Sequence, residues 1–147
     1  MNPTVTIILP AYNGALWIEK AIKSALAQSY ADFEMIIMND RSRDTTGDIA
    51  RRFATLDTRI RYFENNINLG VQKTRNLALG YALGKYIAEI DQDDEWLDPE
   101  KLSKQVSFLN NNPDYVLVGT GAIVVDEDGH EIARYLMLET DEEIRNV

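Results

Sequence analysis

The sequence predicts an α/β fold: a three-layer α/β/α sandwich around a mostly parallel sheet, with a small C-terminal antiparallel hairpin. Strand-like apolar runs alternate four times with helix-like segments, which favours parallel strands joined by helices on both faces of the sheet. After Pro113 the alternation gives way to strand-like runs around a tight turn. The 147 residues suffice for one domain with its own core, so we expect residues 1–147 to form a single domain.

Four short runs rich in β-branched and aromatic residues predict the parallel strands, at residues 5–9, 33–38, 60–63 and 86–90. Pro10 is expected to end the first of them. Two further strands are expected at 115–118 and 122–125. A turn at 126–129 then leads into a return strand at 131–138 and a short polar helix from about residue 140.

Apolar residues at helical spacing follow each parallel strand, in segments 17–26, 45–54, 71–82 and 102–109. Asn13 is a candidate cap for the first helix and Ser42 or Asp44 for the second. Asp98 as cap, with Pro99 at the first helical position, is expected to start the fourth.

Composition excludes several classes of protein. The net charge of −9, from 15 basic and 24 acidic residues, argues against nucleic-acid binding, which needs a basic surface. The absence of cysteine excludes disulfides and thiolate metal sites and favours a reducing compartment. The apolar run near the start is too short for a membrane span or a signal peptide. We therefore expect a cytoplasmic chain without a membrane span.

An acidic loop follows the fourth predicted strand and carries Asp91, Asp93 and Asp94. The carboxyl ends of strands in open α/β sheets are where ligands bind, and crowded carboxylates repel one another unless a cation offsets them. Mg²⁺ or Mn²⁺ typically uses one or two carboxylates plus substrate phosphates. The alternative is a solvated acidic loop. Glu89 is unusual in a buried strand, and we expect it at an edge or beside a Lys or Arg, without a catalytic role.

Two earlier loops and one helix carry further candidates. The turn at residues 10–14 offers backbone amides and the ring of Tyr12, which can stack on a base; otherwise it is a simple strand-to-helix turn. Asp40 can accept a hydrogen bond from a base imide or act as a capping residue. Arg75 can reach a base or phosphate, or lie on a solvated helix face. His130 has no second histidine to form a triad or zinc site and is expected in an exposed turn.

Taken together, these loops resemble those of the family-2 glycosyltransferases, which have the GT-A fold with its Rossmann-like sheet. The matching pieces follow the order and spacing of that family over roughly residues 4–126. They are ILPAYNG at 8–14, NDRSRD at 39–44, NLG at 68–70 with Arg75 and Asn76, and DQDDEW at 91–96 continuing to PEKL at 99–102.

The resemblance implies a nucleotide-diphosphate-sugar donor, with UDP favoured, and a Mn²⁺ or Mg²⁺ ion. It implies a base site lined by Pro10, Ala11 and Tyr12 with Asn13 beside them, a hydrogen bond from Asp40 to the base, and support of the nucleotide by Arg75. It also implies that Asp93 is the metal ligand, that Asp91 lies near the ribose or sugar, and that Asp94 supports them. An acceptor hydroxyl on a glycan, lipid or other molecule would then displace the nucleotide with inversion, assisted by an Asp or Glu base.

Two departures from the family pattern bear on this interpretation. Arg41 stands where the family usually has Gly, so the backbone there is expected to differ. None of Asp126, Glu127 and Glu139 matches the general-base motif of the family. We therefore expect the base and the acceptor-binding segment beyond Val147, and this chain to be a donor-binding portion, truncated before that segment, of a protein that can associate with membranes.

Three alternatives have different consequences. A non-catalytic nucleotide-sugar-binding module would bind the donor without transferring it. A phospho-receiver domain needs an acidic pair just after the first strand, where this chain has Pro10, Ala11 and Tyr12. A sugar nucleotidyltransferase needs a glycine-rich basic phosphate loop at that place, which the sequence lacks.

Overall fold

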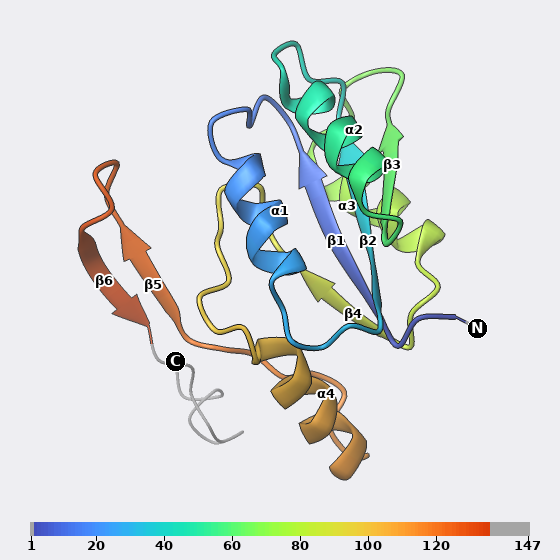
Figure 1. The fold of residues 1–147 in the computed structure, drawn as a ribbon, viewed down its shortest axis with the longest axis vertical. Coiled ribbons are helices and arrows are strands. Elements are labelled where there is room, and N and C mark those ends of the chain that lie inside the picture. The colour runs from blue at the N-terminus through green and yellow to red at the C-terminus, as the bar shows by residue number, and fades with distance from the viewer. Residues whose placement is uncertain (1, 136–147) are drawn as a thin grey trace. The chain divides into compact units, whose positions relative to one another are not determined.

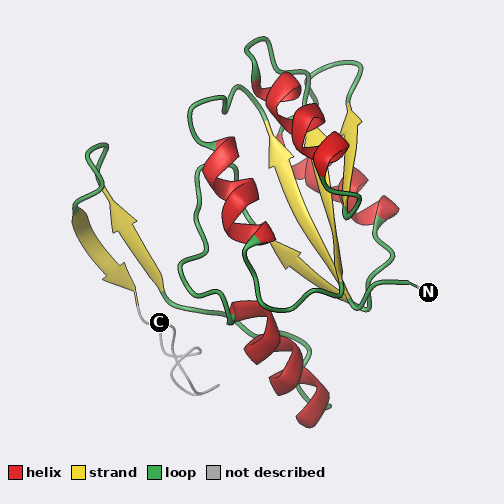
Figure 2. Ribbon diagram, viewed as in Figure 1, coloured by secondary structure: helices red, strands yellow, loops and turns green. Residues whose placement is uncertain are grey.

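A computed structural model describes residues 2–135, and the chain divides between Val106 and Ser107 into two compact units. The first unit contains a four-stranded sheet with the strand order β3-β2-β1-β4 and all neighbours parallel. Its strands are β1 (Val5–Ala11), β2 (Phe33–Asn39), β3 (Ile60–Glu64) and β4 (Tyr86–Glu89). The arrows of this sheet point the same way in Figure 2, so the four carboxyl ends share one edge.

Helices cover both faces of this sheet, which confirms the predicted three layers. α1 (Ile18–Leu26) and α2 (Thr46–Leu56) pack on one face, and α3 (Val71–Tyr81) packs on the other (Figure 1). α4 (Lys101–Asn111) begins in the first unit and ends in the second. In α1 the buried residues Ile18, Ala21, Ile22 and Ala25 recur at helical spacing, as predicted.

The two central strands are buried along their whole length because helices cover both of their faces. Alternate residues of β1 therefore enter different cores. Ile7 and Leu9 pack with α1 and α2, whereas Ile8 packs with Ile36 and with Ala78 of α3.

Pro10 does not end β1 as expected, since the strand continues to Ala11. The carbonyl of Ile8 accepts the N–H of Ile90, so the backbone hydrogen-bonding groups of Ile8 point toward β4. The backbone nitrogen of Pro10, two residues later, points to the same side. The pairing with β4 stops at Ile8 and Glu89. The N–H that proline lacks therefore has no ladder partner to lose.

Two of the expected helix starts are wrong. α1 begins at Ile18, four residues after Gly14, and Asn13 does not cap it. α4 begins at Lys101, two residues after the expected Pro99, because Pro99 and Glu100 form a separate turn. Asp98 nonetheless accepts the N–H of Glu100 at 2.9 Å, as the expected cap would. At α2, one of the two expected caps contributes, because Asp44 accepts the N–H of Thr46 at 3.0 Å.

The second unit contains the predicted antiparallel hairpin, formed by β5 (Ala122–Val125) and β6 (Glu131–Tyr135). The expected strand at 115–118 is wrong, since these residues are irregular. Their composition favours a strand, but composition specifies no partner strand to complete a ladder. The expected continuation of the return strand to 138 and the polar helix from 140 lie outside the described residues. Within residues 2–135, no helix is long and apolar enough to cross a membrane.

Candidate functional site

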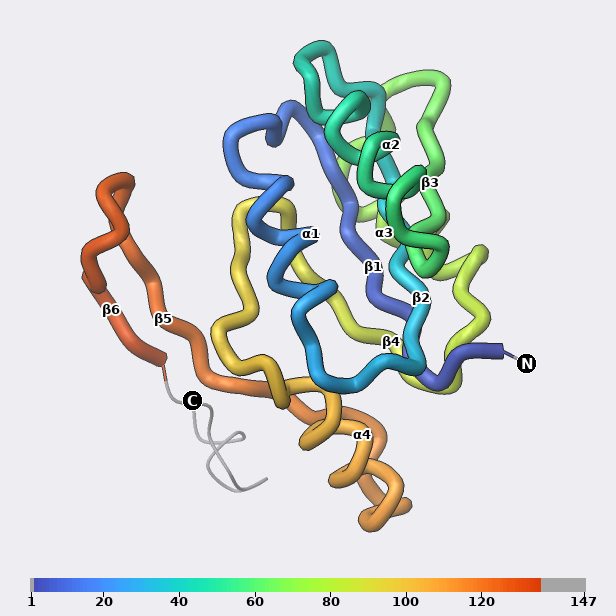
Figure 3. Tube along the Cα trace, viewed as in Figure 1, coloured from blue at the N-terminus to red at the C-terminus, as the bar shows by residue number. Residues whose placement is uncertain are grey.

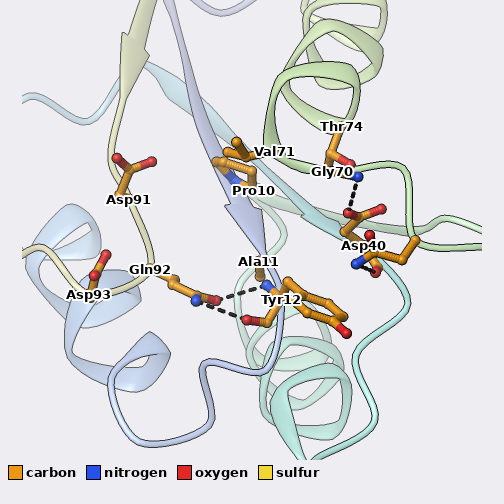
Figure 4. Close-up of a pocket in the computed structure, with 11 residues that line it drawn as sticks. Pro10, Ala11, Tyr12, Asp40, Gly70, Val71, Thr74, Asp91, Gln92 and Asp93 are labelled. Atoms are coloured by element: carbon orange, nitrogen blue, oxygen red, sulfur yellow. Dashed lines mark hydrogen bonds between the residues drawn. The ribbon is translucent and has the colours of Figure 1, made fainter.

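A pocket of about 350 Å³ lies at the carboxyl edge of the parallel sheet (Figure 4). The turns after β1, β2 and β3 gather at this end of the first unit although they are distant in sequence (Figure 3). Of the predicted site residues, the pocket brings together Pro10, Ala11, Tyr12, Asp40, Asp91 and Asp93. It adds Asn68, Gly70, Val71, Thr74 and Gln92.

The turn after β1 is bonded to the turn after β2, and its amides are not free as the sequence suggested. The N–H of Asn13 donates to Ser42 Oγ at 3.0 Å, and that of Gly14 donates to Thr46 Oγ1 at 2.8 Å. The N–H of Ala15 donates to the carboxylate of Asp44 at 3.2 Å. This turn therefore supplies a fixed surface, and no free cluster of amides for a phosphate.

Asn13 takes part in this contact and does not line the pocket. Its backbone is left-handed, with φ 48°, a conformation that asparagine adopts more readily than most residues. Its side-chain oxygen accepts the N–H of Arg43 at 2.8 Å. In this structure Asn13 joins two turns of the site.

Asp40 is 3% exposed and contributes to the pocket from the end of β2. One carboxylate oxygen accepts the N–H of Leu69 and the amide of Asn65, each at 2.8 Å, and the other accepts the N–H of Gly70 at 2.8 Å. Burial alone would raise the pKa of Asp40, but these hydrogen bonds and one with Thr74 outweigh it, and the pKa is lowered. Asp40 is therefore an ionised residue that fixes the loop before α3 at the pocket.

The side chain of Arg75 extends from α3 to Glu89 at the end of β4 and to Asp91 in the acidic loop after it. Its Nη2 donates to Asp91 Oδ1 at 2.7 Å, and its Nε lies 3.5 Å from Glu89 Oε2 without a hydrogen bond. The side chain is 29% exposed, so it does not lie on a solvated face. Glu89 thus has the arginine neighbour expected for it, on a strand at the end of the four-stranded sheet.

The acidic loop forms a turn in which Asp94 N–H donates to the carbonyl of Asp91 at 3.1 Å. Burial of its carboxyl group raises the pKa of Asp94, and the negative charges of Asp91 and Asp93 raise it further. The negative charge of Asp91 is offset by its ion pair with Arg75. Within the described residues, the carboxylate of Asp93 makes no hydrogen bond or ion pair, and Asp93 lines the pocket.

Comparison with known proteins decides the family of this chain. The sequence model of the family described as Glycosyl transferase family 2 matches residues 6–146, which is most of the sequence. The chain belongs to glycosyl transferase family 2.

Individual relatives agree with this family. The chain is 39% identical to EpsE of Bacillus subtilis (strain 168) over 136 residues, which is 92% of this chain and 49% of EpsE. It is 37% identical over 123 residues to WfgD of Escherichia coli, named as a UDP-Glc:alpha-D-GlcNAc-diphosphoundecaprenol beta-1,3-glucosyltransferase; the match covers 82% of this chain and 46% of WfgD. The chain thus spans about half the length of these curated relatives.

Solved structures of glycosyltransferases share the fold. S. aureus TarS 1-349 in complex with UDP-GlcNAc superposes with a TM-score of 0.69 at 26% identity, over 77% of this chain and 32% of TarS. The mannosyltransferase PcManGT from Pyrobaculum calidifontis, in complex with GDP-Man and Mn2+, gives a TM-score of 0.69 at 26% identity, over 86% of this chain and 36% of PcManGT. These neighbours confirm the GT-A fold of this family-2 chain.

The acidic loop of this family-2 member has a donor set that fits a hard divalent cation. Among residues 2–135 the carboxylate oxygens of Asp93 have no hydrogen-bond or ion-pair partner, and Asp94 is a carboxyl group whose ionisation a cation would favour. Within residues 2–135, the acidic loop does not bring three such ligands together. A cation here would therefore need oxygen atoms from a bound ligand, as Mg²⁺ and Mn²⁺ sites commonly do.

Within the described residues, a group of three possible metal ligands lies elsewhere, in the β5–β6 hairpin. Ligand atoms of Asp126, Asp128 and His130 lie within 4.8 Å of one another, and all three residues are exposed. One oxygen of Asp126 accepts the N–H groups of Asp128 and His130, so this carboxylate shapes the turn. His130 is an exposed turn residue, as predicted.

Gln92 and Thr74 are two of the five pocket residues that the sequence did not assign to the site. Gln92 stands between Asp91 and Asp93, in the middle of the predicted metal motif, and Thr74 lies one helical turn after Gly70. The sequence indicated a role for Gln92 only through its place between Asp91 and Asp93. Which way its side chain points depends on a residue 80 positions earlier, and a local pattern does not contain that information.

Proposed function

We propose that this chain is the donor-binding part of a glycosyltransferase that moves a sugar from a nucleotide diphosphate to an acceptor hydroxyl. Transfer would proceed with inversion and with Mn²⁺ or Mg²⁺, in polysaccharide, lipopolysaccharide or glycoconjugate synthesis. The observation that supports this most is the pocket itself. It has an aromatic ring and the acceptor Asp40 on one side, and the unpaired carboxylate of Asp93 on the other (Figure 4).

The side of the pocket with Tyr12 and Asp40 suits a nucleobase. Tyr12 is partly exposed, so its ring is available for stacking, and Pro10 and Ala11 line the pocket beside it. A carboxylate only accepts hydrogen bonds, so Asp40 favours a base with a ring N–H, which uracil, thymine and guanine have and cytosine lacks. A uridine, thymidine or guanosine diphosphate is therefore the expected donor nucleotide, with UDP favoured.

The side with Asp91 and Asp93 suits the diphosphate and the sugar. Asp93 would hold the cation, which when bound neutralises diphosphate charge and stabilises the departing nucleotide. Arg75 keeps Asp91 near α3, where its second oxygen is free to accept a ribose or sugar hydroxyl. The acceptor hydroxyl would attack the anomeric carbon opposite the leaving nucleotide and give its proton to an Asp or Glu base. No residue of the pocket is assigned as that base.

A thermal-shift experiment tests donor binding. UDP or GDP with Mn²⁺ at about 100 times its Kd should raise the Tm of the native chain by about 5–10 °C. Asp93→Asn removes one carboxylate charge with little change of shape and should abolish the part of the shift that depends on Mn²⁺. Glu95→Gln is the matched control, since Glu95 is an exposed carboxylate of the same loop that does not line the pocket.

The absence of any shift with UDP, GDP, CDP and dTDP, each with and without Mn²⁺, would overturn the proposal. An unchanged Mn²⁺-dependent shift in Asp93→Asn would assign the metal to other residues. Nucleotide release from a bound sugar donor distinguishes an enzyme from the alternative, a non-catalytic binding module, which binds the donor and leaves it intact.

A further inference from the structure

Gln92 connects the acidic loop to the turn after β1 through both ends of its side-chain amide. Its Oε1 accepts the N–H of Tyr12 at 2.9 Å, and its Nε2 donates to the carbonyl of Tyr12 at 3.0 Å (Figure 4). Both distances are those of good hydrogen bonds, and the paired geometry fixes the direction of the amide as well as its position. Two loops that lie 80 residues apart in sequence are thus held together at the pocket.

The side chains of the acidic turn have separate tasks. Asp91 is paired with Arg75, and Gln92 is paired with the backbone of Tyr12. Asp93 is left without such a partner in the described chain and lines the pocket. The position of Asp93 relative to the Tyr12 side of the pocket therefore depends on the Gln92 amide that precedes it.

We propose that Gln92 is a positioning residue that couples metal binding at Asp93 to nucleotide binding at Tyr12. The inference rests on the proposed function, because it assumes that a nucleotide diphosphate and a divalent cation share this pocket. A bound nucleotide orders the Tyr12 turn, and through the two hydrogen bonds it also orders the loop that carries Asp93. By thermodynamic linkage, a bound cation favours nucleotide binding by the same factor.

Gly14 shows that the space for the Gln92 amide is built into the turn. A Cβ added to Gly14 would lie 2.1 Å from Gln92 Oε1, far inside van der Waals contact. The obstacle is the end of a flexible side chain, and Gly14 has no left-handed φ that would require glycine. Gly14→Ala should therefore displace Gln92 and leave the rest of the turn in place.

A double-mutant cycle on the intact 147-residue chain tests the coupling. Calorimetric titration with UDP, and separately with GDP, gives Kd without metal and with saturating Mn²⁺. The ratio of the two Kd values is the coupling factor, expected to be about fivefold or more in the native chain. In Gln92→Ala and in Gly14→Ala, this factor should fall by about twofold or more and stay above one, because the contact between Mn²⁺ and the diphosphate remains. In the double variant Gly14→Ala adds nothing, because the side chain that it displaces is already gone.

Ser42→Ala is the matched control. Ser42 Oγ accepts the N–H of Asn13, so it holds the same turn from the opposite side without contacting the acidic loop. Its loss should lower the Tm and leave the coupling factor unchanged. A merely structural role for Gln92 would give the same result in Gln92→Ala.

The outcomes separate the two proposals. If the native chain shows metal-dependent nucleotide binding and Gln92→Ala keeps the native coupling factor, the inference about Gln92 is wrong and the proposed function stands. An additive effect of Gly14→Ala in the Gln92→Ala background would also overturn it. If the native chain binds none of UDP, GDP, CDP and dTDP, the proposed function fails first and the inference fails with it.

Discussion

Arg41 adopts a left-handed backbone conformation, with φ 62°, directly after the buried Asp40. The resemblance implied glycine at this position and a backbone that differs with arginine there, but Arg41 adopts the left-handed conformation that glycine allows most readily. Such a conformation costs an ordinary L-residue about 1–2 kcal/mol. The ion pair from Arg41 Nη1 to Glu64 Oε1 at 3.0 Å offsets part of this cost at most, because the arginine side chain is 60% exposed.

Replacing Arg41 by glycine and by alanine separates the backbone cost from the ion pair. Both variants lose the ion pair, but only glycine relieves the left-handed conformation. After allowing for the larger chain entropy of glycine in the unfolded state, Arg41→Gly should be about 0.5–1 kcal/mol more stable than Arg41→Ala. Urea unfolding followed by circular dichroism measures the difference. Equal stability of the two variants would mean that the turn relaxes to another conformation when the arginine is removed.

The start of α3 depends on a residue from another element. Gly70 precedes the helix with φ 82° and has no side chain to cap it. The carboxylate of Asp40, at the end of β2, accepts the N–H groups of both Leu69 and Gly70. The sequence left open whether Asp40 is a capping residue or a ligand-binding residue, and the structure shows it fixing the loop before α3 while lining the pocket.

Asp40→Asn should destabilise the chain by about 2 kcal/mol at pH 7, because one acceptor becomes an amide donor facing a buried N–H and the negative charge is lost. The lowered pKa of Asp40 fixes the sign of the pH dependence. Its contribution is fully present above the unfolded-state value near 3.8 and is lost as the pH falls through the lower folded value. The stability difference between native chain and variant should therefore shrink below about pH 4.

Urea unfolding between pH 3 and pH 7 measures this difference. Asp48→Asn is the control, since the Asp48 side chain is 72% exposed on α2 and should change stability by no more than about 0.5 kcal/mol. A stability difference for Asp40→Asn that grows as the pH falls would contradict the assignment of Asp40 as an ionised, hydrogen-bonded carboxylate.

Secondary structure followed the sequence where one local pattern decided it. The spacing of Ile18, Ala21 and Ile22 predicts α1, because the residues on the buried face of a helix recur every three or four positions in the sequence. Pro10 and residues 115–118 were mispredicted for the opposite reason. Whether a proline interrupts a strand, or an apolar run becomes one, depends on which partner strand lies beside it.

The same limit applies to the site. That Asp40, Asp91 and Asp93 would line one pocket could be predicted, because polar residues at the ends of parallel strands meet at one edge of the sheet. The role of Gln92 could not, because its partner is the backbone of Tyr12, and any residue type offers the same N–H and C=O there.

Across the whole molecule, the parallel sheet explains how short polar segments with no stable structure of their own become one pocket. Strands β1 and β2 are fully buried, and the loops that follow them are tied to each other and to the acidic loop by hydrogen bonds. Ligand binding at any one of these loops should therefore be felt by the others. The β5–β6 hairpin belongs to the second unit.

Hydrogen exchange measured by mass spectrometry tests this view of the site. With Mn²⁺ and whichever of UDP and GDP binds more tightly, amide exchange should slow together in peptides covering residues 9–15, 39–45, 65–75 and 91–96. Asp93→Asn with the same nucleotide should keep the slowing near Tyr12 and only part of the slowing in 91–96, because Gln92 still links that loop to the Tyr12 turn while the cation does not bind. Slowing in one loop alone would mean that these loops do not act as a single donor site.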